Sequence, residues 1–373
     1  MIRSLLDYWP GLALIALVLF AVGCQQNMQQ HGDEGVIRGT LSTQNETEQE
    51  EQTEKTDSEA LARHDQQISN EPQEETEPEV ESKHLIHENT ELEGFCLDLD
   101  PSATPIERVS ADCKTISARL ASVSYQACRA ANFRHSNCSS HLGFPIYVAE
   151  FAPLASRQHR GRVLVVGGTH GDELTSVSIV FRWIEKLNQF HSGLYHWRMV
   201  PLMNPDGVLR PDAQRTNNQG VDLNRNMPSA DWHKLALDTW QRRTGKDPRK
   251  FPGDAPASEP EVQWMLDEIK LFKPHAIISV HAPYGIVDFD APILNKAPKQ
   301  LGRLRLNMLG TYPGSLGNYA GIDQNIPVIT LELPHAWVMP SHQESTKIWE
   351  DIVSWLKKHV DQRDSSAAQA KHN

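Results

Sequence analysis

The feature that most limits how this chain can fold is its alternation of short apolar runs with longer amphipathic segments between Ile146 and Val360. Short apolar runs are typical of buried strands, and apolar positions three and four residues apart are typical of helices. The predicted strands are Arg162–Val166, Trp197–Met203, Ala276–Val280 and Val328–Leu333, and the predicted helices cover Glu173–Leu187, a segment that opens at Ser258, and His342–His359. This order favours an α/β domain with a mixed, mostly parallel sheet flanked by helices. In such sheets, ligand sites lie at the carboxyl ends of the strands.

The net negative charge of the chain comes from one segment before this domain. The 373 residues carry a net charge of -12, and residues 25–83, with 16 acidic and 4 basic residues, account for all of it. Residues 25–90 are also nearly free of aromatic side chains, so we expect a disordered acidic linker. A solvated spacer is the favoured interpretation, and an interaction tail is the alternative. Because the rest of the chain is neutral, composition argues against nucleic acid as a partner.

The first residues have the pattern of an export signal. Arg3 precedes an apolar run of 13 residues, Gly11–Gly23, which is shorter than the ~20 residues needed to span a bilayer. The run ends in Ala-Val-Gly before Cys24, which resembles a bacterial lipobox. We expect residues 1–23 to be a lipoprotein signal peptide and Cys24 to carry a lipid that anchors the protein to a membrane of the bacterial cell envelope, on the periplasmic side. An uncleaved anchor and an ordinary signal peptide are the alternatives.

Four further cysteines lie in residues 91–145, which we treat as a cysteine-bearing N-terminal segment before a catalytic domain at 146–362 and a disordered tail at 363–373. They are Cys96, Cys113, Cys128 and Cys138. An even number of cysteines in an exported protein predicts two disulfides, with three possible pairings. Free buried thiols are the alternative. No Cys-x-x-Cys occurs, so a cysteine-based structural zinc site is not expected.

A candidate metal site follows two of the predicted strands. His170 and Glu173 stand three residues apart, directly after the strand that ends at Val166. This spacing lets an imidazole and a carboxylate reach one ion where a strand turns into a helix. His281 follows the strand that ends at Val280 and can supply a third ligand. Two histidines and one glutamate leave one coordination position open, which predicts a catalytic site with one Zn²⁺ ion.

Several short motifs around these ligands resemble those of the zinc carboxypeptidase family, and most closely its murein peptide amidase branch. In chain order they are GGTHGDE (167–173), NPDG (204–207), Arg215, GVDLNRN (220–226), SEPE (258–261), SVHAP (279–283), PGSLG (313–317) and ITLELP (329–334). The resemblance covers roughly Ile146 to Val360 and none of the first 145 residues. It implies a zinc carboxypeptidase-like fold and a peptide hydrolase that uses zinc.

The resemblance also implies roles for individual residues. Glu332 matches the family's general base, a role that explains a charged residue in an otherwise apolar strand. Arg215 matches the arginine that stabilises the negative charge of the reaction. Asn224 and Arg225 match the residues that bind the terminal carboxylate of the substrate. Asp222 matches the carboxylate that orients the first zinc-bound histidine.

The segment around residues 312–319, which is expected to determine substrate specificity, resembles the family less closely than the other motifs do. Tyr312 is the candidate for the family's tyrosine that closes over the substrate, and Tyr319 is the alternative. Ser315 is expected among the substrate-binding residues. Ala282 stands where related amidases carry aspartate, which is expected to change substrate contacts and not zinc binding.

Together with the export signal and the lipid anchor, these matches predict an enzyme of the cell envelope that cleaves the bond between γ-D-glutamate and meso-diaminopimelate in murein peptides. We expect the enzyme to be a monomer. Three alternatives stay open. The chain can be a general zinc carboxypeptidase that acts on any peptide with a free C-terminus, a relative of the aspartoacylases and desuccinylases that hydrolyses acyl-amino acids, or a non-catalytic lipoprotein that binds the cell wall.

Overall fold

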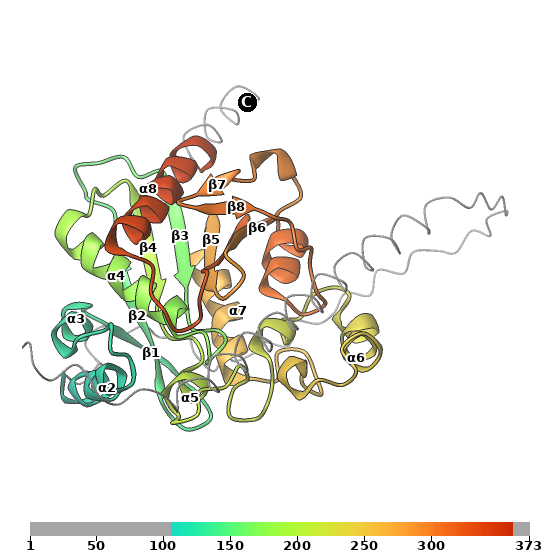
Figure 1. Cartoon of the computed structure of the whole chain (residues 1–373). Coiled ribbons are helices and arrows are strands. Elements are labelled where there is room, and N and C mark those ends of the chain that lie inside the picture. Colours follow the sequence, from blue (N-terminus) through green and yellow to red (C-terminus); the bar gives the residue numbers. More distant parts are fainter. Residues whose placement is uncertain (1–105, 361–373) are drawn as a thin grey trace, which may run out of the picture. The chain divides into compact units, whose positions relative to one another are not determined.

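The computed structural model describes residues 106–360, apart from the side chains of residues 135–137. Within this range, nine strands form one sheet in the order β1-β2-β4-β3-β5-β9-β6-β8-β7 (Figure 1). The strands are β1 (Arg134–Ser139), β2 (Pro145–Phe151), β3 (Gly161–Val166), β4 (Tyr195–Val200), β5 (Ala276–His281), β6 (Ile286–Asp290), β7 (Gln300–Leu301), β8 (Leu304–Leu306) and β9 (Val328–Glu332).

Helices connect and cover these strands. The α-helices are α2 (Ile106–Arg119), α3 (Tyr125–Ala130), α4 (Leu174–Phe190), α5 (Pro205–Leu209), α6 (Trp232–Arg242), α7 (Pro260–Phe272) and α8 (His342–His359). The short helical turns are η2 (Leu223–Arg225), η3 (Pro248–Lys250), η4 (Leu294–Lys296) and η5 (Gly317–Asp323), the last of which is a π-helix.

The sheet is mixed, as the sequence predicted, with a parallel centre. β4, β3, β5 and β9 pair in parallel, and the pairings of β1 with β2, β2 with β4, and β6 with β9 are antiparallel. The four central strands are the four predicted from apolar runs. Strands buried on both faces read as continuous apolar sequence, which is why these were the ones that could be recognised.

Side chains of the central strands alternate between two cores. Val163 and Val165 of β3 pack in the same core as the buried faces of α4 and α8, and these two helices lie side by side (Figure 1). Leu164 and Val166 point the other way and pack in the same core as the buried face of α7. The period of two along a strand therefore puts helices on both faces of the sheet.

The segment before Ile146 is continuous with this sheet. β1 pairs with β2 and so forms one edge of the sheet, upstream of the start that the sequence motifs suggested. Helices α2 and α3 contribute Cys113, Ile116 and Cys128 to the core shared with α4. β1 has the sequence RHSNCS, which lacks the apolar pattern of a strand, so periodicity gave no signal for it.

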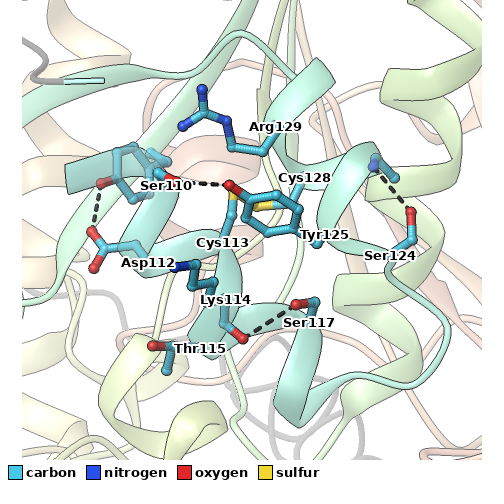
Figure 2. Close-up of a disulfide and its surroundings, with 12 residues drawn as sticks. Ser110, Asp112, Cys113, Lys114, Thr115, Ser117, Ser124, Tyr125, Cys128 and Arg129 are labelled. Carbon is cyan, nitrogen blue, oxygen red and sulfur yellow. Dashed lines mark hydrogen bonds between the residues drawn. A yellow bond between two sulfur atoms is a disulfide. The ribbon is translucent and has the colours of Figure 1, made fainter. Parts of the chain in front are cut away.

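A disulfide between Cys113 and Cys128 joins α2 to α3 (Figure 2). Beside it, the Ser110 hydroxyl and the Tyr125 hydroxyl are 2.7 Å apart and share a hydrogen bond. Cys138 in β1 is also disulfide-bonded. The prediction of disulfide chemistry in this segment is therefore confirmed, and one of its pairings is identified.

The remaining predictions about the ends of the chain concern residues outside the description. They are the signal peptide at 1–23, the lipid on Cys24, the linker at 25–90, Cys96 and the tail at 363–373. Among residues 106–360, none of the helices combines the length and the apolar character that crossing a bilayer requires.

Candidate active site

The parallel strands bring the predicted catalytic residues together at their carboxyl ends. His281 is the last residue of β5, and it pairs in register with Glu332, the last residue of β9. His170 lies four residues beyond the end of β3, and Glu173 occupies the N-cap position of α4. Since β5 lies between β3 and β9 in the sheet, these loops and strand ends meet at one edge.

His170, Glu173 and His281 form a compact, buried group of potential metal ligands. The Nδ1 atoms of the two histidines are 3.1 Å apart. The two carboxylate oxygens of Glu173 lie 2.7 Å from His170 Nδ1 and 3.0 Å from His281 Nδ1. Ligand atoms of a tetrahedral zinc ion, at bond lengths of about 2.0–2.2 Å, are roughly 3.3 Å apart. The three side chains therefore fit a single zinc ion with little rearrangement.

The other nitrogen of each imidazole is held by a neighbouring side chain. His170 Nε2 lies 3.2 Å from Asp222 Oδ1, and His281 Nε2 lies 3.0 Å from Ser279 Oγ. Such contacts fix the orientation of a ligand ring and select the nitrogen that faces the metal. Both rings thus present Nδ1 to the site. Asp222 was predicted for this role, whereas Ser279 was not.

Glu173 and Asp222, the two buried carboxylates in contact with His170, both have lowered pKa values. Burial alone would raise the pKa of Asp222, but the nearby charges of Arg215 and His170 hold that pKa well below its usual range. Burial also opposes ionisation of Glu173, and the charges of the two histidines lower its pKa in spite of it. A deprotonated Glu173 is the form that coordinates a metal.

The NPDG motif supports the loop that carries His170. The Asn204 side chain donates hydrogen bonds of 3.2 Å to the Thr169 and Arg215 carbonyl oxygens, so it ties two parts of the site together. Gly171 lies against the backbone of Gly207, and a Cβ atom at Gly171 would stand 2.2 Å from the Gly207 carbonyl carbon. This close approach explains why both motifs carry glycine at these places.

Arg215 lies next to the metal ligands. Its Nε donates a hydrogen bond of 3.0 Å to Asp222 Oδ2, and its Nη1 is 3.7 Å from Glu173 Oε1. The side chain is mostly buried. A cation fixed in this position can stabilise negative charge that develops beside the metal.

Asn224, Arg225 and Tyr312 form a second polar group in the same cavity. The guanidinium of Arg225 stacks 4.3 Å from the centre of the Tyr312 ring. Asn224 Oδ1 accepts a hydrogen bond of 2.9 Å from the Leu316 backbone, which orients its amide group. A planar guanidinium next to an amide donor is suited to bind a carboxylate.

One cavity contains nearly all the predicted site residues. It is lined by His170, Glu173, Arg215, Asn224, Arg225, His281, Tyr312, Ser315 and Glu332. Asp222 lies beneath it, in contact with His170 and Arg215. Tyr319 packs instead against the core around α7, so Tyr312 is the tyrosine of the two that faces the cavity. Ala282 donates its backbone N–H to Glu173 at 3.2 Å, a contact that does not depend on its side chain.

Two buried aspartates in the cavity were not predicted. Asp288 and Asp290 of β6 line it together with Tyr284 and Thr330. Burial raises the pKa of Asp288 to about 6, and burial together with the charge of Asp288 raises the pKa of Asp290 well above its usual range. Two adjacent carboxyl groups in a polar cavity favour a positively charged ligand group there.

Alternation along the strands explains how these aspartates reach the cavity. Val287 and Phe289 pack in the core with α4 and α8, so Asp288 and Asp290 point to the opposite face. Thr330 pairs with Asp288 in register and points the same way. The sequence IVDFD contains this signal, because charges at alternate positions of a strand directly after a metal ligand indicate a lined cavity.

The helical turn η5 closes over this acidic pair. A Cβ atom at Gly317 would lie 2.0 Å from Asp290 Oδ2, so only glycine lets the backbone approach the carboxylate. The hydroxyl of Ser315, two residues earlier, accepts a hydrogen bond of 3.1 Å from Asn318 N in this turn. The PGSLG motif therefore shapes the end of the cavity that contains Asp290.

Known proteins with similar sequences are zinc carboxypeptidases and murein peptide amidases. Residues 132–287 match the family model described as zinc carboxypeptidase. The chain is 34% identical over 213 residues to murein peptide amidase A of Escherichia coli K12, a match that covers 56% of this chain and 83% of the relative. It is 31% identical over 187 residues to murein peptide amidase A of Vibrio campbellii, which covers 48% of this chain and 72% of the relative.

Solved structures show the same fold. Carboxypeptidase A from Helicoverpa armigera matches with a TM-score of 0.50 and 17% identity, over 69% of this chain and 73% of that structure. The family model begins at residue 132, close to the start of β1, and so agrees with a sheet that includes the strand before Ile146.

We predict that replacing Asp222 with Asn weakens zinc binding about 10–100-fold, the usual cost of losing a carboxylate that orients a ligand histidine. The affinity can be measured by competition with a zinc chelator. Asp172→Asn is the matched control, because Asp172 lies in the loop between His170 and Glu173 but its carboxylate pairs with Arg249 at 2.8 Å. Equal affinities for D222N and D172N would contradict this role for Asp222.

Proposed function

This chain belongs to the zinc carboxypeptidase family, and we propose that it is an amidase of the cell envelope that cleaves the γ-D-glutamyl–meso-diaminopimelate bond of murein peptides. The observation that carries the proposal is the composition of a single cavity. It combines a zinc-type ligand set, a buried glutamate, a carboxylate-binding pair and an acidic pair.

Hydrolysis at one end of the cavity depends on the metal ligands, Glu332 and Arg215. A zinc ion held by His170, Glu173 and His281 would activate water and polarise the carbonyl of the scissile amide. Glu332, buried at the end of β9, takes the proton of the attacking water and later delivers it to the leaving amine. Arg215 stabilises the negative charge that develops on the carbonyl oxygen.

The carboxylate-binding pair sets which bond is cleaved. Arg225 and Asn224 bind the terminal carboxylate of the substrate, and Tyr312 packs over the guanidinium of Arg225. Fixing the carboxylate positions the amide of the last residue next to Glu332 and the metal ligands. The enzyme therefore removes a single residue with a free carboxylate, as a carboxypeptidase does.

The acidic pair favours meso-diaminopimelate as that residue. Its side chain ends in a second amino-acid group, with an ammonium that plain apolar residues lack. Asp288 and Asp290 offer the negative charge that such a group requires. The similarity to two murein peptide amidases supports the same substrate. A general carboxypeptidase for apolar C-terminal residues would have no use for two buried carboxyl groups.

The proposed location rests on the sequence alone. The export signal at 1–23, the lipobox-like Cys24 and the linker at 25–90 would anchor a monomeric enzyme to a membrane and let it reach murein peptides in the periplasm. This arrangement suits a substrate that is produced outside the cytoplasm.

The substrate is tested by incubating the zinc-loaded protein with L-Ala-γ-D-Glu-meso-diaminopimelate and with an ordinary α-linked peptide that ends in alanine. We expect release of meso-diaminopimelate, detected by mass spectrometry, to be faster than release of alanine and to stop when a chelator removes zinc. Cleavage of the α-linked peptide alone would overturn the murein assignment and leave a general carboxypeptidase.

The role of Glu332 is tested by Glu332→Gln, which keeps the size of the side chain but removes the base. Turnover should fall by about 10²–10⁴-fold, while the affinity for zinc stays within a few-fold of that of the unchanged protein. Glu350→Gln, on the exposed side of α8, is the control and should retain full activity. Activity of E332Q near the control level would remove Glu332 as the base.

The acidic pair predicts a pH-dependent preference for C-terminal residues whose side chain carries an ammonium group. Because the pKa of Asp288 is raised to about 6, the pair loses negative charge as the pH falls through 6. The ratio of kcat/KM for the meso-diaminopimelate peptide to that for the same γ-linked peptide ending in alanine should rise about tenfold from pH 5 to 7. The ratio cancels titration of the shared catalytic groups.

Asp288→Asn is the matched variant for this pH experiment and should flatten the rise. A ratio that is independent of pH in the unchanged protein would contradict the assignment, and so would an undiminished rise in D288N.

A further inference from the structure

Two motifs contain acidic residues that the catalytic cavity does not use. Asp206 of NPDG, and Glu259 and Glu261 of SEPE, are all buried and lie outside the cavity lining. Glu259 and Glu261 flank the start of α7. His141, in the turn between β1 and β2, reaches the same place, where its Nε2 lies 2.9 Å from Glu259 Oε2.

His141, Glu259 and Glu261 form a second group of potential metal ligands. One ligand atom from each of these residues lies within 4.8 Å of the others. The His141 side chain is 29% exposed, so its ring can rotate and solvent can reach the group. Ligand atoms that share one ion stand about 3–4 Å apart, so binding an ion would draw these three atoms slightly closer together.

Apart from His141, the polar contacts of these carboxylates are with neutral groups. Glu259 accepts from Ser258 Oγ at 2.7 Å and from Asn217 Nδ2 at 2.6 Å, in addition to its contact with His141. Asp206 accepts from Ser140 Oγ and from the Leu142 backbone. Among the described residues, no lysine or arginine donates to any of the three carboxylates.

Glu261 provides an independent sign of a ligand. The residue is fully buried, and Asn217 Nδ2 donates to its Oε2 at 3.3 Å. Its Oε1 has no hydrogen-bond partner among the described residues. Burial raises the pKa of Glu261 to about 7. A proton on Oε1 would itself need an acceptor, whereas a cation would satisfy the oxygen and the charge together.

We propose that His141, Glu259 and Glu261 bind a second divalent metal ion that is structural and separate from the catalytic zinc. An imidazole with two carboxylates suits a borderline ion such as Zn²⁺ better than Ca²⁺ or Mg²⁺, which select oxygen ligands only. The ion links the β1–β2 turn to the start of α7. Through Asn217, it also supports the segment between Arg215 and Asp222.

The proposal is independent of the catalytic assignment, and it is tested by counting metal ions. The full chain is dialysed against Zn²⁺, and bound zinc is measured by mass spectrometry for the unchanged protein, His141→Gln, Glu261→Gln and Glu268→Gln. We expect two ions per chain in the unchanged protein and one in H141Q and E261Q. E268Q is the matched control, since Glu268 is buried on the same helix but pairs with Arg198, and it should bind two.

The variant H141Q is expected to fold, because His141 is partly exposed and its replacement removes a ligand without disturbing the core. H141Q should also lose the part of the zinc-induced rise in Tm that the unchanged protein gains from the second ion. One ion per chain in the unchanged protein at saturating zinc would overturn the proposal. Glu261 would then be protonated instead of bound to a metal ion. Two ions in both H141Q and E261Q would overturn the proposal as well.

Discussion

The parallel pairing of β3, β5 and β9 is the constraint on which the active site depends. It places the ends of three strands at one edge, and the register of β5 with β9 sets His281 directly beside Glu332. A shift of one residue would turn these side chains to the core face. The apolar residues that alternate with them, such as Val280 and Leu331, are fully buried. Burial of the apolar side chains on one face of these strands thus determines which side chains face the active site.

The loops that follow the strands contribute the other catalytic side chains. Polar side chains next to the cavity fix the positions of these residues by hydrogen bonds. Asp222 contacts His170 and Arg215, and Asn204 ties the loop of His170 to the backbone of Arg215. The metal ligands and the anion-stabilising arginine therefore share supports and should respond together to substitutions. Substrate binding shares this support, because the Asn224 backbone N–H donates a hydrogen bond of 2.9 Å to Asp222 Oδ1.

The central strands and the metal ligands could be predicted because short apolar runs end in distinctive motifs. The edge strand β1 could not, since RHSNCS has no apolar pattern and owes its conformation to pairing with β2. Asp288 and Asp290 were missed because their role depends on which face of β6 meets the cavity. Spacing also could not choose between Tyr312 and Tyr319, and only the packing of η5 separates them.

The central claim is that His170, Glu173 and His281 hold a zinc ion through the Nδ1 atoms of both histidines. Anomalous diffraction at the zinc edge from crystals of the zinc-loaded protein tests it directly. The account predicts a peak within about 2.0–2.2 Å of both Nδ1 atoms and of a Glu173 oxygen. Zinc bound through an Nε2 atom, or no peak between these three side chains, would contradict it.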